Sequence, residues 1–453
     1  MNETKPSSEA KAAVTTEPSK PVAKTQPQPE QKSRKTKKLK KAKKSANPDS
    51  ADQNPQKPEH KTAKIILYIF LLLLFFGLVC VITVIVLIAT REPESAPEID
   101  RVEYPDPIYS TLTGEEISDA ALNNSPTFCV QIPNGKDGAR PQAGLNQAAV
   151  VFEAIAEAGI TRFAAVFQNA NVSAIGPIRS LRPYYLEWDL PFDCTIVHSG
   201  GSDEALAALR RTGARELDES TVYMWRETGS DRMWNNLFTS ASKLTRYNTE
   251  RGWTSSNVKA FARYTPEEND QALAENLTCQ ANQDGAEIPA DAENTDSCDA
   301  TAVTNIRINF SGVPSYNTIY QYDTENNRYL RSYANGEEHL TYTCPENLNQ
   351  PRTTTDCGEP SPVAPKVVVA MFVNERKMSD GYHENITTIG SGSATIFQNG
   401  EVIEGTWQKL SASDQIVFRD NSGDLIKFAP GQVWIAAVPI YSSSVNWDLS
   451  NNL

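Results

Sequence analysis

An uncharged, strongly apolar run from Ile65 to Thr90 constrains this chain more than any other feature. No charged side chain lies between Lys64 and Arg91, and a helix of this length can cross a hydrocarbon core about 30 Å thick. A secretory signal peptide is the alternative, but its apolar region spans only about 7–15 residues and lies near the N-terminus. We therefore predict a single transmembrane helix over residues 65–90.

The charges on the two sides of this run predict its orientation. Residues 1–64 hold 16 Lys and Arg against 7 Asp and Glu, and nine of the basic side chains lie between Lys32 and Lys44. The other flank, REPESAPEID, is acidic, and residues 65–453 carry a net charge of −22 within a chain total of −13. The positive-inside rule predicts a cytoplasmic N-terminus and an extracytoplasmic position for the bulk of the chain.

The basic tail, residues 1–64, is rich in Lys, Pro, Ala, Gln and Ser and contains too few apolar side chains to form a core. We predict that it is disordered. Its basic run suits contact with anionic lipid headgroups, although a solvated tail without a partner fits the composition equally well. We expect no specific nucleic-acid partner.

Cysteine usage agrees with an oxidising compartment, because six cysteines follow the apolar run and Cys80 lies inside it. We predict two local disulfides, and leave a third pair open because six cysteines allow fifteen pairings. No CxxC motif and no His/Cys cluster with zinc spacing occurs, so we expect no metal site and no cofactor. The predicted pairs are Cys279–Cys298 and Cys344–Cys357, with Cys129–Cys194 as the open third pair.

The remainder divides by composition into a stalk (91–120), a mixed domain (121–264), an acidic linker or insertion (265–300) and a second domain (301–445). The mixed domain combines short apolar runs with an amphipathic helix that Gly213 ends, which predicts an α/β or α+β fold. The second domain alternates short strand-like runs with turns such as Asn399-Gly400 and is predicted to be mostly β. The runs predicted as strands are 128–132, 150–156, 161–167, 194–197, 306–310, 315–322, 329–333, 366–373, 392–397, 415–419, 425–428 and 432–438, and the helix is 203–211.

Arginines dominate the polar motifs of the mixed domain. Arg179 and Arg182 lie three residues apart between two prolines, and guanidinium groups bind carboxylate or phosphate through paired hydrogen bonds. Arg140 and Arg162 can converge on the same place. The alternative is that these arginines pair with acidic residues of the same domain in a structural network.

Two further motifs are candidates for chemistry. His198 and Ser199 follow a predicted strand and precede the helix, so they can supply hydrogen bonds to a ligand; a nucleophile-and-base role has weaker support. Glu153 and Glu157 have the spacing to share one face, and two carboxylates can hydrolyse a glycosidic bond. Ion pairing of these carboxylates with the arginines is the more ordinary alternative.

These motifs also carry a family resemblance. The runs ARPQAGLNQAAVVFEAIAEAGITRFAAVFQ, GPIRSLRPYYLEWDL, HSGGS and GSGSATIFQNGEVIEGTWQK resemble the bacterial YerB-like lipoprotein family, over roughly residues 110–440. The resemblance implies an extracytoplasmic bacterial protein with an α/β N-terminal domain and a β C-terminal domain. It brings no established activity. Members are often lipid-anchored through a cysteine, whereas this chain has the apolar helix.

Three hypotheses for function follow. The first is a membrane-anchored cell-envelope protein that binds an anionic or carbohydrate-bearing envelope ligand through Arg179 and Arg182, with contributions from Arg140, Arg162, Glu153, His198 and Ser199. The second is a hydrolase or transferase acting on an envelope polymer. The third is a structural scaffold without catalysis. Arginines that prove to be fully paired with carboxylates would favour the scaffold.

Overall fold

The computed structural model describes residues 60–89, 106–229, 232, 234–283, 302–345, 353–441 and 444–450, and the structural statements below concern these residues. The chain divides into two units, Met1–Arg101 and Val102–Leu453, and each is described by itself.

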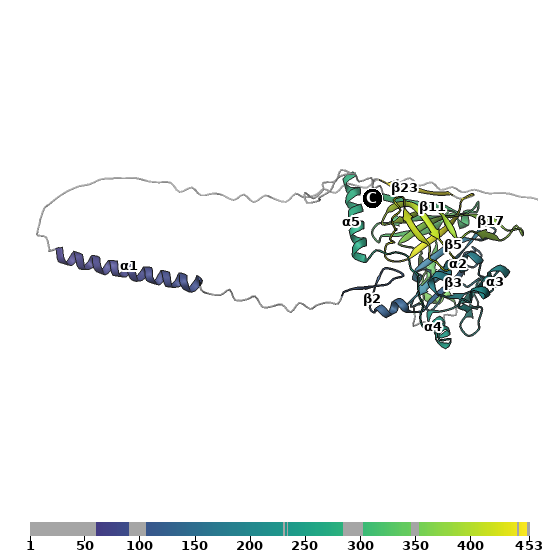
Figure 1. Cartoon of the computed structure of the whole chain (residues 1–453), viewed down its shortest axis with the longest axis horizontal. Helices are drawn as coiled ribbons and strands as arrows, with labels where there is room; N and C mark the ends of the chain where they lie inside the picture. The colour runs from purple at the N-terminus through teal and green to yellow at the C-terminus, as the bar shows by residue number, and fades with distance from the viewer. Residues whose placement is uncertain are drawn as a thin grey trace, which may run out of the picture. The chain divides into compact units, whose positions relative to one another are not determined.

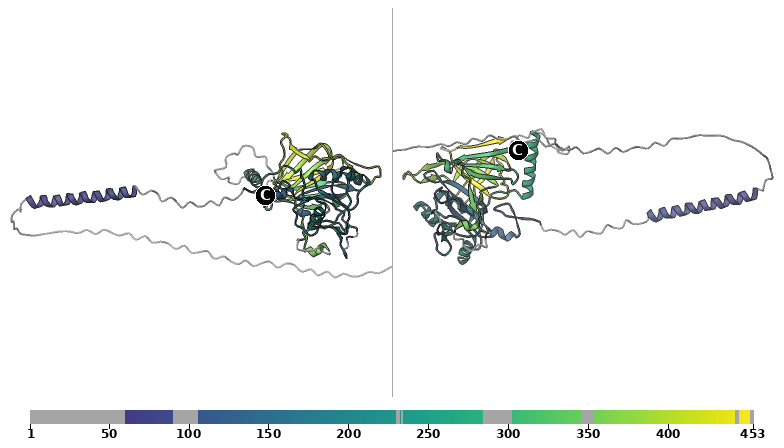
Figure 2. Two further views of the ribbon diagram at one scale, coloured as in Figure 1. Left: turned by 60° about the horizontal axis from the view of Figure 1, so that its bottom comes forward. Right: turned by 180° about the vertical axis from the view of Figure 1, so that it is seen from behind.

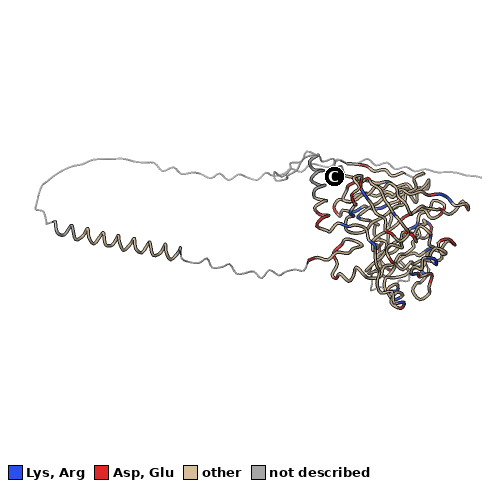
Figure 3. Tube along the Cα trace, in the orientation of Figure 1, with Lys and Arg blue, Asp and Glu red and all other residues tan. Residues whose placement is uncertain are grey.

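The first unit contains helix α1, His60–Ala89, which confirms that the apolar run is helical. Its stretch Ile65–Leu87 is long and apolar enough to cross a membrane. The large apolar side chains along this stretch are exposed. None of its residues is charged, as the tan trace of this helix shows in Figure 3. An exposed apolar surface of this length is unfavourable in water, so it favours a lipid environment.

The second unit consists mostly of strands (Figures 1 and 2). It is built on one ten-stranded sheet, in the order β21-β20-β19-β16-β22-β5-β6-β3-β7-β8. The first five strands in this order come from the C-terminal half of the chain and the last five from the N-terminal half. The two halves meet where β22 runs parallel to β5, with Trp434 opposite Val151. The strands are β3 (Thr127–Pro133), β5 (Val150–Glu157), β6 (Ile160–Gln168), β7 (Thr195–Val197), β8 (Glu216–Leu217), β16 (Val367–Val373), β19 (Gly390–Gln398), β20 (Glu401–Lys409), β21 (Val417–Asp420) and β22 (Val433–Pro439).

Both faces of this sheet are covered, which is why its central strands are apolar throughout rather than alternating. One face packs against helices α2 (Pro183–Asp189) and α3 (Asp203–Thr212). The other packs against helix α4 (Ala241–Glu250) and a second sheet, β13-β12-β11-β23. The strands of the second sheet are β11 (Ala302–Asn309), β12 (Thr318–Asp323), β13 (Arg328–Tyr333) and β23 (Ser444–Ser450).

Short elements complete the second unit, and a three-stranded sheet, β15-β14-β4, again joins the two halves. They are β1 (Ile108–Tyr109), β2 (Glu116–Ile117), β4 (Gln142–Ala143), β9 (Trp225–Arg226), β10 (Leu237–Phe238), β14 (Leu340–Tyr342), β15 (Ser361–Pro362), β17 (Glu375–Lys377), β18 (Glu384–Ile386) and the 3₁₀ helices Ala120–Asn124, Leu145–Gln147, Leu190–Phe192, Pro314–Tyr316 and Thr354–Cys357.

The predicted fold class is confirmed: a mixed α/β part precedes a mostly β part. Helix α3 begins after Ser202, whose hydroxyl accepts a hydrogen bond from the Ala205 amide, and ends at Gly213 in the left-handed region. Asn399 and Gly400 both have positive φ and form the turn between β19 and β20, as the Asn-Gly pair predicts. The run 425–428 forms only isolated bridges, so the prediction of a strand there was wrong.

Two segments are more ordered than their composition suggested. Part of the predicted acidic linker is helix α5, Pro266–Gln283. Thr265 and Glu268 cap its start reciprocally, each side chain accepting a hydrogen bond from the other's backbone amide, and Pro266 occupies the first turn. In the predicted stalk, Leu112 is fully buried, so residues 106–120 belong to the folded unit.

Two disulfides lie among the residues of the folded unit that the structure describes. Cys344–Cys357 is confirmed and closes a local loop with a sequence separation of 13. Cys129–Cys194, the pair left open, links residues 65 apart: Cys129 lies on β3, and Cys194 immediately precedes β7, the parallel neighbour of β3. The predicted Cys279–Cys298 pair includes Cys298, which lies outside the described residues, so that pair stays a prediction.

Candidate functional site

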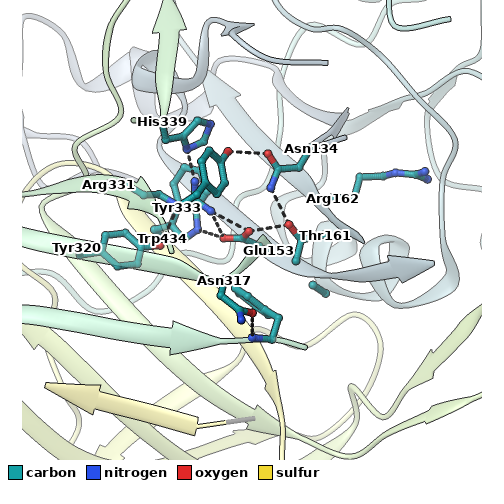
Figure 4. A network of polar contacts seen from close by, with 12 residues as sticks. Asn134, Glu153, Thr161, Arg162, Asn317, Tyr320, Arg331, Tyr333, His339 and Trp434 are labelled. Atoms are coloured by element: carbon teal, nitrogen blue, oxygen red, sulfur yellow. Dashed lines mark hydrogen bonds and ion pairs between the residues drawn. The ribbon is translucent and has the colours of Figure 1, made fainter. Parts of the chain in front are cut away.

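Glu153, a predicted ligand contact, lies in the centre of the folded unit. Its carboxylate accepts two hydrogen bonds of 2.9 Å from Arg331 on β13, and both side chains are fully buried. Thr161 and the indole N–H of Trp434 donate to the same carboxylate at 2.9 Å each (Figure 4). Every lone pair of the anion is thereby directed at a donor, so Glu153 is a structural ion in this fold.

On its other side, Arg331 contacts a neutral histidine, His339. Burial, together with the charge of Arg331, holds the pKa of His339 well below its usual range. The neutral imidazole can therefore accept a hydrogen bond from Arg331 at Nδ1, while its Nε2–H donates to Gln142 Oε1 at 3.0 Å. Arg140 is also engaged nearby: it donates to Asn134 and to the Ser315 carbonyl.

Glu157 is the centre of a second ion cluster, which contains two of the predicted ligand-binding arginines. Arg162 donates to one carboxylate oxygen at 2.7 Å and Arg182 to the other at 2.8 Å. Burial by itself would raise the pKa of Glu157, but the two guanidinium charges outweigh it and lower the pKa. Arg162 also donates to the Ser180 carbonyl at 2.7 Å. This bond links β6 to residues 176–182, which contain Arg179 and Arg182 and which we call the arginine loop.

The prediction that Glu153 and Glu157 share one face was wrong. The pairing of β5 with β6 shifts register between Ile155 and Glu157, so Glu157 lies opposite Ile160 rather than one position further along. A bulge of this kind moves the following side chain to the other face of the sheet. Arg162 accordingly extends away from the Glu153 network (Figure 4). The two carboxylates cannot flank one sugar.

Arg179 differs from the other three arginines. No hydrogen bond or ion pair of its half-buried guanidinium is found within the described ranges, whereas Arg140, Arg162 and Arg182 each have a carboxylate partner. Its backbone is nevertheless fixed. The Arg179 amide donates to the Gln131 carbonyl on β3 at 2.9 Å, and its carbonyl accepts from the Ser199 amide at 3.1 Å. The structure thus brings Arg179 and Ser199 together, as predicted. Arg182 instead pairs with Glu157.

His198 and Ser199 lie at the end of β7, and their polar atoms are occupied by neighbouring groups. His198 is fully buried, with Nδ1 at 2.9 Å from the Gly200 carbonyl and Nε2 at 3.1 Å from Glu216. The Ser199 hydroxyl donates to Glu219 at 3.0 Å. His198, Glu216 and Asp218 each have one potential metal-ligand atom, and these atoms lie within 4.8 Å of one another. The sequence spacing did not indicate this cluster, because His198 and the two carboxylates come from different segments.

Two hollows among the described residues lie away from these side chains, beside the Gly-Ser-Gly-Ser stretch that begins β19. A cavity of about 370 Å³ is lined by side chains of β16, β19, β20 and the neighbouring loops. A second, of about 380 Å³, shares Phe372 and Ser393 with the first, so the two adjoin. The first is lined by Phe372, Asn374, Thr387, Ile389, Gly390, Ser391, Gly392, Ser393, Trp407 and Ile440, and the second adds Ala394, Thr395, Glu404, Gly405, Asn421, Val445 and Trp447. We call the two together the Ser393 groove.

Gly392 shapes this groove. A Cβ atom there would lie 2.6 Å from the Trp407 indole nitrogen and 2.7 Å from the Phe372 carbonyl oxygen, far inside normal contact distances. Glycine therefore allows the indole to lie against the strand, where its N–H donates to the Phe372 carbonyl at 2.8 Å. We missed this groove from the sequence, although small residues repeating through a strand beside a tryptophan are the signal that could have indicated it.

Comparison with known proteins places these features in a family. Residues 112–254 match the family model described as "Protein of unknown function (DUF3048) N-terminal domain". Residues 306–435 match the corresponding C-terminal domain. The chain belongs to this family. Its predicted YerB-like, two-domain character is thereby confirmed, and in space the two domains share one sheet.

A similar curated protein is the "Putative lipoprotein YerB" of Bacillus subtilis (strain 168), which is 25% identical over 358 residues, covering 78% of this chain and 91% of that protein. The crystal structure of YerB from Bacillus subtilis matches with a TM-score of 0.56 at 23% identity, over 75% of this chain and 99% of that one. At this identity the structural likeness shows a common fold.

Proposed function

We propose that this is a membrane-anchored, extracytoplasmic cell-envelope protein that binds the saccharide part of an envelope polymer in the Ser393 groove. The name of the Bacillus relative, a lipoprotein, supports a place at the outer face of a membrane. Helix α1 would supply the anchor here, since Ile65–Leu87 is long and apolar enough to span a bilayer. The acidic flank and the basic tail support an N-terminus in the cytoplasm.

The observation that carries this proposal is the lining of the groove. Ser391, Ser393 and Asn374 offer hydroxyl and amide groups, whereas Phe372 and Ile440 offer apolar surface. A sugar ring needs both kinds of contact, because its hydroxyls form hydrogen bonds and its C–H faces pack against apolar side chains. The lining contains one ionisable side chain, Glu404, which favours a neutral saccharide over an anionic one.

A second candidate, an anionic ligand at Arg179, has one specific observation in its favour: the half-buried guanidinium has no partner within the described ranges. The carboxylates at Asp218 and Glu219 near Ser199 oppose it by charge repulsion. The hydrolase or transferase alternative has less support, because Glu153 and Glu157 lie on opposite faces of β5 and each is held by arginine.

Binding to two soluble probes tests the proposal with the full-length protein in detergent micelles. One probe is a neutral oligomer of N-acetylhexosamine and the other an oligomer of glycerol phosphate. Because Ser393 lines both halves of the groove, Ser393→Trp should abolish binding of the neutral oligomer. Ser255→Trp, at an exposed loop position that does not line the groove, is the matched control. Arg179→Lys should leave this binding unchanged.

The outcomes separate the candidates. Binding of the phosphate oligomer alone, weakened by about 1–3 kcal/mol in Arg179→Lys and unaffected by Ser393→Trp, would favour the Arg179 site instead. If neither probe binds, the proposal fails and the scaffold hypothesis gains.

A further inference from the structure

A pair of glutamates, one buried and one half-buried, lies on the hairpin of β17 and β18, outside both sites described above. The strands are antiparallel, with Glu375 opposite Ile386 and Lys377 opposite Glu384. Residues directly opposite one another share a face, and so do residues two apart on one strand. Glu375 and Glu384 are therefore diagonal neighbours on the same face of the hairpin.

Their carboxylates lack the partners that buried anions need. Glu384 is only 5% exposed, and its Oε2 atom has no hydrogen-bond partner in the part of the chain that the structure describes. The Oε2 atom of Glu375 is buried and unpartnered in the same way. A buried carboxylate without a donor is strongly unfavourable, so these two oxygens point to a missing electropositive group.

The surrounding charges do not supply that group. Burial, and then the charge of Glu384, raise the pKa of Glu375 to about 8. Burial also raises the pKa of Glu384. Lys377 opposes both shifts but is outweighed, and the structure records no ion pair between Lys377 and either glutamate.

We propose that Glu375 and Glu384 bind a divalent cation of the hard, oxygen-preferring class, with Ca²⁺ as the fitting ion. Diagonal neighbours in an antiparallel pair lie close enough for long side chains to meet. Ca²⁺ takes carboxylate oxygens at about 2.3–2.6 Å, completes its shell with water and tolerates irregular geometry, whereas Mg²⁺ demands a near-ideal octahedron. A donor set made of carboxylates selects such cations over softer transition metals.

The ion would link the two strands of a hairpin that borders the Ser393 groove. Asn374 immediately precedes β17 and Thr387 immediately follows β18, and both line the groove. The Thr387 amide donates to the Asn374 carbonyl at 2.9 Å, so the two groove residues move with the hairpin. The cation site stands on the glutamates alone and does not require the groove to bind sugar.

Calcium titration of the chelator-treated, full-length protein in detergent tests the site. The wild-type protein should show saturable Ca²⁺ binding by calorimetry and a rise in melting temperature, with a smaller response to Mg²⁺. Glu384→Gln and Glu375→Gln should each remove the Ca²⁺ response. Both should also keep or raise the melting temperature without calcium, because each replaces a buried, unpaired charge by a neutral group of the same shape.

Glu325→Gln is the matched control, since Glu325 is exposed in a turn between β12 and β13 and should retain the full response. An unchanged Ca²⁺ response in both glutamine variants would overturn the site. So would a wild-type protein without any response, whose stability instead simply rises on acidification, because a proton alone would then satisfy the pair. A protein that responds to calcium but does not bind the sugar oligomer would contradict the proposed function of the groove and would leave the cation site supported.

Discussion

Glu153 and Glu157 lie four residues apart on one strand, and the fold uses them in opposite ways. Glu153 faces the second sheet and binds Arg331, a residue 178 positions away in the other half of the chain. Glu157 faces the helical layer and binds Arg162 and Arg182 from its own half. The first carboxylate is fully buried, whereas 14% of the second side chain is exposed.

The difference shows what one bulge changes on a strand that packs against two layers: alternation would place Glu157 on the face of Glu153, and the register shift turns it to the other layer. Before the register shift, β5 contributes to the junction between the two halves, since it pairs with β22 and carries the Arg331 ion pair. After the shift it holds the loop that contains Arg182. The ion pair of Glu153 therefore stabilises the assembly of the two halves, whereas that of Glu157 positions a local loop.

The largest expected effect is at the junction. Glu153→Gln should leave the Arg331 cation buried without its counter-charge and should lower the free energy of unfolding by roughly 3–5 kcal/mol. Urea unfolding, followed by tryptophan fluorescence, measures this change. Replacing both partners, as Glu153→Leu with Arg331→Met, should recover much of the loss, because it leaves neither charge buried. If Glu153→Gln lowered the free energy of unfolding by less than Glu157→Gln does, the contrast between the two glutamates would be contradicted.

An intermediate effect is expected at the loop. Glu157→Gln removes the anion from between Arg162 and Arg182, and we expect a loss of about 1–3 kcal/mol in the free energy of unfolding. The loss is smaller because 14% of the Glu157 side chain is exposed, and because Arg162 and Arg182 each keep a hydrogen bond to a backbone carbonyl. Hydrogen exchange should show increased opening confined to the arginine loop, with β22 and its neighbours unchanged; increased exchange at the junction instead would mean that the two sites are coupled.

The smallest effect concerns Asp189, a buried carboxyl without an arginine. Burial raises its pKa well above the usual value, opposed by a hydrogen bond from Gln131 at 2.8 Å. The folded state therefore favours the protonated acid, and this contribution to stability is present below about pH 4 and is lost as the pH rises toward the folded pKa. Asp189→Asn should hardly change the free energy of unfolding in acid, and it should reduce the decline of that free energy at higher pH. A slope that persists in this variant would assign the pH dependence to other groups.

Much of the fold could be predicted because its signals are local. Alternating and apolar runs predicted β3, β5, β6, β16 and β22, and Gly213 predicted the end of α3. The Thr265 and Glu268 pair is a capping-box signal for a helix, and the prediction of a linker, which rested on acidic composition alone, did not include it. Of the candidate site residues, Arg162 and Arg182 pair with Glu157, as the alternative of a structural network predicted, whereas Arg179 has no ion-pair partner among the described residues.

The sequence by itself determined the apolar helix, the order of mixed and β parts, and the local Cys344–Cys357 disulfide, because each depends on residues within a few turns or one short loop. Only the tertiary structure decided that β22 pairs with β5, that Glu153 meets Arg331, and that a bulge turns Glu157 to the other face. Strand pairing and register are chosen by the packing of the whole core, since a shift of one residue exchanges every buried side chain for an exposed one. No local sequence pattern specifies which strands pair or in which register they do so.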